Sequence, residues 1–463
     1  ARMPSSIERI CWHRTLLTAL IVLPTTLART GPIQAAEKVT LNEPVTDSRV
    51  YRVDHQLNVS GQLETAAGGG KSRTLELKVA ADHRFRERRL SGTGRGPAAL
   101  RSLRDYDTAQ AKIVVAGQTS SSRLRANRRR SVAQGRRDGV VSYSPTGSMT
   151  SGEVELLEVP ADSLALLALL PLNPIEVGDT WEPASWAVQM LTGTEAILKS
   201  KLTCKLDKVA SDTAHVSFNG SIEGATDGAS TEIKLTGNYQ FDLKRGFIKQ
   251  AEMTQTEKRT VGAVSPGMNI EAKVILKRQL AKTPGPLTTA AVEQIPLEPP
   301  ESAMQLTLQT PWNVRLNHGR DWSLFHQSGD TAVLRLLDAG SLIAQCNMTH
   351  ITSAAAGKHT SEEQFQNDVR QALGKRLKTI TKAEQLEVTD GRFLYRVTAV
   401  GESNGVQMHW FYYLCAAPSG QQVTFVFAVE TKLLKQLANR DLKIVSTIEF
   451  LTTQPTRSAN KRD

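Results

Sequence analysis

The arginines between residues 123 and 137 are the side chains whose type and spacing most clearly suggest chemistry with a partner. They are Arg123, Arg125, Arg128, Arg129, Arg130, Arg136 and Arg137. Guanidinium groups donate paired hydrogen bonds to phosphate, sulfate or carboxylate, so this set is a candidate anion-binding site. More arginines support it upstream, at Arg84, Arg86, Arg88, Arg89, Arg95, Arg101 and Arg104. The alternative is a solvated strand edge whose charge prevents aggregation.

Sequence motifs for catalysis are weak. Gly70-Lys71-Ser72 resembles the end of a phosphate-binding loop, but Thr65 stands where the first glycine is required, and we expect no helix after it. The sequence contains neither HExxH nor GxSxG. These patterns predict a protein without catalytic residues or a cofactor.

Isolated polar residues add little to that prediction. Asp105 and Asp107 could contact a divalent cation, but such a site needs more oxygen ligands, so two solvated turn residues are the simpler interpretation. His409 lies in an expected strand, and a catalytic histidine needs a partner that the sequence does not identify. We therefore expect no metal site.

Three cysteines follow the first 36 residues, and they are Cys204, Cys346 and Cys415. No CxxC or Cys/His cluster has zinc-ligand spacing. Cys346 and Cys415 both lie in expected strands of the C-terminal part, so a disulfide between them is one interpretation for an oxidising compartment. Two small buried hydrophobic residues are the other.

Composition limits the class of protein. The chain has 463 residues, 40% of them hydrophobic, which is enough for two or three domains. Its formal net charge of +11 favours an acidic partner. Aromatic residues make up only 5%, so we do not expect platforms that stack nucleic-acid bases.

Residues 1–36 have the pattern of a secretory signal peptide. Arg9 and Arg14 precede an apolar run at 16–23, and small residues follow at Ala28 and Ala36. The run is shorter than the roughly 20 residues that span a bilayer. The pattern predicts a periplasmic or secreted protein that is not transmembrane after cleavage.

Residues 37–282 predict a mainly β domain, built as a large curved antiparallel sheet or half-barrel. Expected strands include those at 49–60, 73–80, 111–116, 140–143 and 153–159, with one or two helical turns at 160–170. Longer expected strands follow at 196–209, 214–223, 231–243, 246–260 and 268–280. A ligand cavity could open between such a sheet and a covering helix.

This part resembles exported, functionally uncharacterised bacterial proteins of planctomycete type. The resemblance lies in RDYDTAQAKIVVAG (104–117), SRLRANRRRSVAQ (122–134), SYSPTGSMTSGEVELLEVPADSLALLALLP (142–171) and IEVGDTW (175–181). It implies an exported β domain and brings no activity with it.

Residues 283–303 are rich in proline and predict a linker, and residues 304–452 predict an α+β domain. Its centre is an antiparallel three-stranded meander at 391–430. Ser361 and Gln364 predict a capping box before a helix with apolar residues every four positions. Helices at 432–450 would cover the sheet, and residues 453–463 would form a disordered tail.

The order of strands, helix, three strands and terminal helix resembles the α/β/α sandwich of the PsbP, Mog1 and DcrB proteins. The residues that carry it are 391–393, 410–413 and 423–429. The resemblance implies a binding or assembly module. We therefore expect an exported, non-catalytic envelope protein that binds a partner, ligand or envelope component such as an anionic polysaccharide, and no specific nucleic acid. The alternatives are a secreted hydrolase with dispersed catalytic residues and a carrier of an apolar ligand in the β domain.

Overall fold

The computed structural model describes residues 38–66, 72–136, 139–388 and 390–451, which all belong to one compact unit. The expected signal peptide and tail lie outside these residues, as do Gly70, Lys71 and Arg137. The described chain is mainly antiparallel strand with short helices, which confirms the expected large antiparallel sheets, while the PsbP-like arrangement of the C-terminal part stays a prediction. None of its described helices combines the length and hydropathy needed to cross a membrane.

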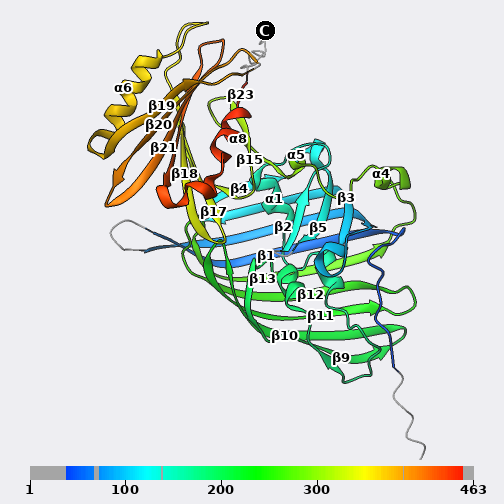
Figure 1. The fold of residues 1–463 in the computed structure, drawn as a ribbon. Helices are drawn as coiled ribbons and strands as arrows, with labels where there is room; N and C mark the ends of the chain where they lie inside the picture. The colour runs from blue at the N-terminus through cyan, green and yellow to red at the C-terminus, as the bar shows by residue number, and fades with distance from the viewer. Residues whose placement is uncertain (1–37, 67–71, 137–138, 389, 452–463) are drawn as a thin grey trace, which may run out of the picture. The chain divides into compact units, whose positions relative to one another are not determined.

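A large antiparallel sheet contains the described strands before residue 281 (Figure 1). In chain order these are β1 (Val50–Ala66), β2 (Ser72–Leu90), β3 (Arg101–Val115), β4 (Gln118–Arg123), β5 (Arg130–Arg136), β6 (Gly139–Tyr143), β7 (Thr180–Trp181), β8 (Ala196–Ser200), β9 (Thr203–Ala210), β10 (Thr213–Thr226), β11 (Ala229–Asp242), β12 (Phe247–Arg259) and β13 (Gly267–Leu280). Their order across the sheet is β6-β5-β3-β2-β1-β13-β12-β11-β10-β9-β7, with β4 paired to β3 and β8 to β10. The first strand, β1, and the last strand, β13, therefore pair with each other in the middle of the sheet.

A helical segment, residues 144–195, connects the two edges of this sheet. It contains α1 (Ser151–Leu157), α2 (Ser163–Leu167), β7 and α3 (Ser185–Thr192). The chain runs outward from β1 to β6, passes through this segment, and returns from the opposite edge to β13. Because both edges are joined through the segment, its apolar residues can cover one face of the sheet.

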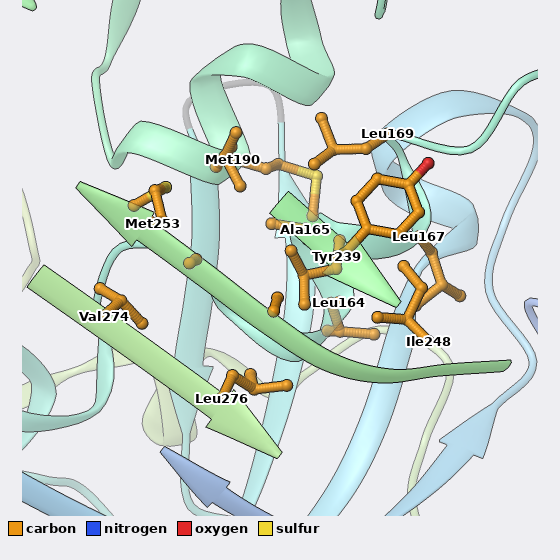
Figure 2. Close-up of a cluster of buried hydrophobic side chains, with 14 of the residues drawn as sticks. Leu164, Ala165, Leu167, Leu169, Met190, Tyr239, Ile248, Met253, Val274 and Leu276 are labelled. Atoms are coloured by element: carbon orange, nitrogen blue, oxygen red, sulfur yellow. The ribbon is translucent and has the colours of Figure 1, made fainter. Parts of the chain in front are cut away.

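Side-chain alternation determines which face is covered. In β1, Tyr51 and Val53 are buried, whereas Arg52 and Asp54 are exposed, because successive side chains of a strand point to opposite faces. Leu164, Leu167 and Met190 of the helical segment join strand residues in one buried cluster (Figure 2). The strand residues that Figure 2 labels are Tyr239, Ile248, Met253, Val274 and Leu276. Over most of its area the sheet therefore has one apolar and one solvated face.

A second antiparallel sheet forms the C-terminal part, in the order β16-β17-β18-β22-β21-β20-β19. Its strands are β16 (Trp322–Gln327), β17 (Thr331–Asp338), β18 (Ser341–Ile351), β19 (Leu377–Gln385), β20 (Phe393–Ser403), β21 (Val406–Ala416) and β22 (Gln422–Glu430). A small sheet contains β14 (Leu306–Gln309), β15 (Val314–His318) and β23 (Glu449–Phe450). The adjacent strands β20, β21 and β22 confirm the expected meander.

Both faces of the second sheet are buried. On one face, Ile444 of α8 (Arg440–Ser446) and Leu437 of α7 (Leu434–Leu437) share a core with Phe427. On the other, Phe365 and Val369 of α6 (Glu362–Leu373) pack with strand residues. Helices thus cover both faces (Figure 1). The remaining elements are α4 (Thr289–Glu293), α5 (Glu301–Met304), and the 3-10 turns η1 (Gly96–Ala99), η2 (Ala126–Arg128), η3 (Gly374–Arg376) and η4 (Thr431–Leu433).

Two local predictions need correction. The expected strand at 153–159 is wrong, because α1 occupies Ser151–Leu157. At the start of α6, Ser361 accepts a hydrogen bond from the Gln364 backbone N–H, as expected, but the Gln364 amide instead donates to Asp368 at 2.7 Å. That capping box therefore has only its serine half in the structure.

The proline-rich segment 283–303 packs against the first sheet. Leu287 and Ala303 are buried in a cluster with Val50 and Leu103. Arg88 also donates a hydrogen bond of 3.0 Å to the Leu287 carbonyl. The segment is therefore held in place, and the division into separately folded parts at 283–303 stays a prediction.

Candidate functional site

The helical segment is fixed by caps at its helix ends. Thr150 Oγ1 accepts a hydrogen bond of 3.2 Å from the Glu153 N–H, and Glu153 Oε2 accepts one of 3.0 Å from the Thr150 N–H. This capping box starts α1. Asp162 Oδ1 accepts from the Leu164 N–H at 2.8 Å and starts α2. Both caps therefore supply acidic side chains where the segment meets the sheet.

Arg104 is the centre of a buried charge network between β2, β3 and α2. Its Nη1 and Nη2 donate to the two Asp162 oxygens at 2.7 and 2.6 Å. Its Nε donates to Glu87 Oε1 at 3.1 Å. Arg104 is only 1% exposed. A bidentate pair at this depth attaches α2 directly to the strands.

Glu43 and Arg278 extend the network. Arg278 Nη2 and Nη1 donate to Glu43 at 2.6 and 2.9 Å, and the guanidinium lies 4.4 Å from the Tyr51 ring centroid. Arg89 lies 3.5 Å from oxygens of both Glu43 and Glu87. The buried set contains three carboxylates and three guanidiniums, namely Glu43, Glu87, Asp162, Arg89, Arg104 and Arg278.

Mutual attraction keeps these groups charged. Burial by itself would raise the pKa of Glu87, but the positive charges of Arg89 and Arg104 outweigh burial and lower it to about 2. Burial likewise opposes ionisation of Glu43, and Arg278 and Arg89 lower its pKa in spite of that. Because each carboxylate already has a guanidinium partner, the network suits attachment of the helical segment better than acid–base catalysis.

Two buried histidines attach the same segment through its backbone. His55 Nε2 lies 3.1 Å from the Pro160 carbonyl, and His83 Nε2 lies 2.7 Å from the Leu156 carbonyl. Burial, with a smaller contribution from the charge of His83, lowers the pKa of His55 to about 4. A neutral His55 can therefore donate its Nε2–H to the carbonyl at neutral pH.

A large cavity of about 820 Å³ lies where the helical segment approaches the start of the second sheet. Val154 of α1, Met190 of α3, and Leu306 and Leu324 of the C-terminal part supply apolar walls. Its volume falls within the roughly 300–1,000 Å³ of small-molecule sites. Apolar walls with a few polar groups are typical of such sites, so we take this as the candidate functional site and call it the large cavity.

Carboxylates dominate the charge of the large cavity. Glu155, Glu158, Glu195 and Asp227 line it, and Arg320 is the one cation among its described lining residues. Arg320 pairs with Glu158 at 3.1 Å. Glu155 is exposed, and partial desolvation by the surrounding protein, with a further contribution from the nearby Asp227 charge, raises its pKa.

Three polar groups of the large cavity lack hydrogen-bond partners among the described residues. They are Trp322 Nε1, Thr226 Oγ1 and Ser265 Oγ. Trp322 is 2% exposed, so water outside the protein does not solvate its indole N–H. Each of these three atoms is almost inaccessible to water, so it lies behind the wall of the large cavity and does not face its open volume.

Most of the predicted anion-binding arginines make contacts within the protein. Arg125 forms a bidentate pair with Glu153, with distances of 2.7 and 2.6 Å. Arg128 donates to the Ser148 carbonyl at 2.9 Å, and Arg129 Nη2 lies 3.4 Å from Asp107. These guanidiniums hold loops and the start of α1, so the structure does not gather them into one site.

The other predicted arginines are dispersed. Arg123 is exposed and donates to Gln110 at 3.0 Å, Arg130 is half-buried, and Arg136 lies 3.8 Å from Glu298. Arg123 lines a polar hollow of about 700 Å³ together with Arg84 and Lys112. This hollow is the place where part of the predicted anion site meets solvent.

Three of the upstream arginines that were predicted to support the anion-binding site are buried instead. Arg89, Arg101 and Arg104 are at most 2% exposed and cannot support an anion-binding surface. The sequence of β2 could have indicated this burial for Arg89. Alternate residues of a strand point to the same face, and Glu87 and Arg89 alternate with the inward-facing Phe85. Nothing in the local sequence identifies their distant partners Glu43 and Asp162.

The disulfide interpretation of Cys346 and Cys415 is corrected by the structure, where both thiols are free and buried. Cys346 in β18 faces Phe427 of β22, and Cys415 in β21 faces Val423 of β22. Since β22 lies between them, the two Cα atoms are at least about 9 Å apart, beyond the roughly 7 Å limit for a disulfide. Burial raises the pKa of both thiols.

The remaining isolated candidates also have structural contacts. Asp105 and Asp107 lie 3.7 and 3.4 Å from Arg129. His409 Nδ1 is 3.1 Å from Thr431 Oγ1. Within the described part of the chain, no group of three or more His, Cys, Asp and Glu side chains is arranged to hold a metal.

The sequence matches no protein-family model and no curated protein. Among solved structures, OmpF of Salmonella typhi in complex with daunomycin is similar at 7% identity, covering 82% of this chain and 97% of that chain with a TM-score of 0.13. The translocator domain of the autotransporter NalP from Neisseria meningitidis is similar at 9% identity, covering 83% and 88% with a TM-score of 0.11. Scores this low support no conclusion about fold or function.

Proposed function

We propose that the chain is an exported, non-catalytic protein of the bacterial cell envelope and that it binds a small ligand in the large cavity. The observation that carries this proposal is the combination of volume and lining, with apolar walls from both parts of the chain and a few converging polar groups. The attachment of the helical segment supports it, because the charge network holds the start of α2, and His83 and Arg125 hold α1, which provides part of the wall.

Filling the large cavity tests this proposal. Ser323 lines the cavity in β16, so Ser323→Trp should displace a ligand without removing any described side-chain hydrogen bond. The control is Ser60→Trp on the exposed face of β1. Native mass spectrometry of protein purified from the envelope fraction should show a bound small molecule that Ser323→Trp loses and Ser60→Trp keeps. A ligand retained by both variants would contradict the proposed site.

An anionic envelope polysaccharide is the second proposed partner, at the polar hollow. Arg84, Lys112 and Arg123 line this hollow, and the Arg123 side chain is exposed. Arg123→Gln should elute from heparin at lower salt, whereas Arg245→Gln, an exposed arginine in the turn after β11, should not. Equal elution of the two variants would remove the support for this partner.

For residues 304–452 we propose the binding or assembly role that the resemblance to PsbP, Mog1 and DcrB proteins implies. Export itself is tested by cell fractionation with mass spectrometry of the N-terminus. An intact N-terminus in the cytoplasm would contradict the proposed location.

A further inference from the structure

We propose that an anionic polysaccharide binds across the solvated face of the first sheet, on a row of three arginines. They are Arg52 of β1, Arg86 of β2 and Arg130 of β5, and we call them the arginine row. This inference rests on the second proposed partner, because it names the residues that would hold the polysaccharide and the direction in which its chain lies. Three features carry it: the alignment of the guanidiniums, their lack of partners, and the backbone that holds Arg86.

The strand register aligns the three arginines. Arg52 lies opposite Arg86, and Asp105 of β3 lies opposite both Arg86 and Arg130. Opposite residues of paired strands point to the same face, and Arg52 is exposed, so the row lies on the solvated face. The side chains of Arg52 and Arg86 start about 5 Å apart, and Arg130 follows two strand spacings, or about 10 Å, further on.

The guanidiniums of the arginine row have no hydrogen bond or ion pair with any described residue. Arg86 and Arg130 are half-buried, so water hydrates them only in part. Like charges directly opposite each other in a sheet are destabilising, and Arg52 faces Arg86 in this way. A carboxylate or sulfate between these two guanidiniums would replace repulsion with paired, charge-assisted hydrogen bonds.

Two carboxylates that neighbour the arginine row have other cations beside them. Asp54 lies opposite Lys277 and Arg84 in the adjacent strands. Asp105 lies 3.7 Å from Arg129, which is outside the row. These carboxylates therefore leave the row with an excess of positive charge.

Gly285 holds the guanidinium of Arg86 in place. Its φ is 57°, and its backbone packs so closely on Arg86 that a Cβ atom at this position would collide with Nη1. The segment that contains Gly285 is itself fixed, because Leu287 is buried against the first sheet. A side chain that is already held in place loses less conformational entropy when it binds a ligand. The proline-rich segment thus prepares Arg86 for binding.

The length of the arginine row favours an extended chain over a single anion. From Arg52 to Arg130 the row crosses three strand spacings, about 14 Å, which is more than one phosphate or sulfate can bridge. The residues two positions before and after each member of the row include no aromatic side chain, so the row offers no platform for stacking bases. Arg84, two residues before Arg86, lines the polar hollow, so the bound chain can continue into it. A polysaccharide with anionic groups on successive sugars matches this arrangement.

Fluorescence anisotropy of a labelled heparin octasaccharide on the full chain at pH 7 and low salt tests the inference. Arg52→Gln and Arg86→Gln should each raise the Kd about tenfold, because each removes a charge-assisted pair. The control is Arg73→Gln, which removes an exposed arginine near the start of β2, outside the row. Its Kd should stay within about twofold of the wild type, because salt screens distant charges.

Two variants that keep the charge test the geometry. Arg86→Lys should raise the Kd about threefold or more, because an ammonium lacks the paired donors of a guanidinium. Gly285→Ala should have a similar effect, because the added methyl group displaces the end of the Arg86 side chain. The matched control is Gly357→Ala, at a glycine with a φ of 72° and no atom within 4 Å of an added Cβ, which should bind like the wild type.

Urea titration separates binding from folding. Arg52→Gln should keep or raise the free energy of unfolding, because it removes the repulsion from Arg86. A loss of stability that parallels the loss of binding would show that Arg52 supports the fold, and it would overturn the assignment of this residue to the ligand.

The outcomes also separate this inference from the proposed partner. Heparin binding by the wild type with unchanged affinity in Arg52→Gln, Arg86→Gln and Gly285→Ala would overturn the arginine row and leave the polar hollow, which Arg123→Gln tests. Tighter binding of an oligothymidylate than of the octasaccharide would assign the row to nucleic acid and overturn the polysaccharide. If the folded wild type does not bind heparin, the row and the proposed polysaccharide partner are both overturned.

Discussion

Arg104 tests how strongly the buried network holds the helical segment. In Arg104→Met the carboxylates of Glu87 and Asp162 would stay buried and lose their common partner. Breaking a buried ion pair from one side typically costs about 3–5 kcal/mol, so we expect a decrease of that size in the free energy of unfolding. Urea titration measures it. The control is Arg84→Met, at an exposed position of β2, whose free energy of unfolding should equal that of the wild type.

The two buried histidines His55 and His83 should make the protein less stable in mild acid. Burial lowers the pKa of both residues, that of His55 to about 4, below the usual value near 6.5. As the pH falls from 7 to 5, the unfolded chain takes up protons that the folded chain does not, so folding becomes less favourable. Carboxylates with a lowered pKa, such as Glu87, affect the pH dependence of stability only below about pH 4.5. They therefore do not contribute to the change that the histidines cause between pH 7 and pH 5.

We therefore expect the free energy of unfolding to decrease between pH 7 and pH 5, and His55→Gln to reduce that slope. The change corresponds to one fewer titrating group, at most about 1.4 kcal/mol per pH unit. Urea titrations at several pH values measure it, with His326→Gln at an exposed position as the control. An unchanged slope in His55→Gln would mean that His55 takes up its proton equally in both states.

Residue burial was only partly predictable from the sequence. The alternation of Tyr51 and Val53 with polar neighbours indicates the inward face of β1, and the structure confirms it. Arg89 follows the same alternation in β2, whereas Arg104 lies in a stretch of β3 that is buried on both faces, and the charge of both residues favoured a surface interpretation. Their burial depends on Glu43 and Asp162, which lie far away in the sequence, and pairing of that kind has no local signal.

At the scale of elements, the cap of α1 should contribute measurably to stability. Thr150→Ala removes the side chain that accepts from the Glu153 N–H, and loss of such a cap costs about 1 kcal/mol, up to about 2. The matched control is Thr288→Ala at the cap of α4, a helix with no buried residues, where we expect a smaller effect. Urea titration of both variants measures the difference, and equal losses would contradict a special role for the α1 cap.

The wrong strand at 153–159 shows why elements of this size are hard to predict. Val154 and Leu156 alternate with glutamates, which favours a strand, and α1 has only seven residues, too few for a clear helical period. The sequence Thr150-x-x-Glu153 is a capping-box signal that points to the helix. In contrast, the long strands β10 to β13 alternate over 13 or 14 residues each, and their existence was predictable.

At the scale of the whole molecule, the large cavity could not be predicted from the sequence. Alternating strands and a helical segment predict a covered sheet with room for a ligand, but they do not say which walls meet. The cavity needs α1, the turn at Asp227 and β16 side by side, three places separated by long stretches of chain. Only the tertiary arrangement brings Glu155 near Asp227 and Trp322.

The proline-rich segment 283–303 allows a test of how the two parts of the chain depend on each other. Leu287 is fully buried against the first sheet, so protease cleavage of this segment should be slow in the wild type. Leu287→Asp should release the segment and speed up cleavage at least about tenfold, because burying a carboxylate in an apolar cluster is strongly unfavourable. Leu297→Asp, at a side chain that is 49% exposed, is the matched control and should change little.

The product of that cleavage decides whether residues 304–451 fold separately. The two cores of the second sheet draw only on residues from Leu308 onward, so they should survive the cut. Leu306 belongs instead to the core of the first sheet, and Arg320 pairs with Glu158 across the large cavity. We therefore expect a protease-resistant piece that begins near Met304 and no longer binds the cavity ligand. Mass spectrometry identifies the piece, and degradation of the C-terminal part together with the first sheet would show that the two parts unfold as one cooperative unit.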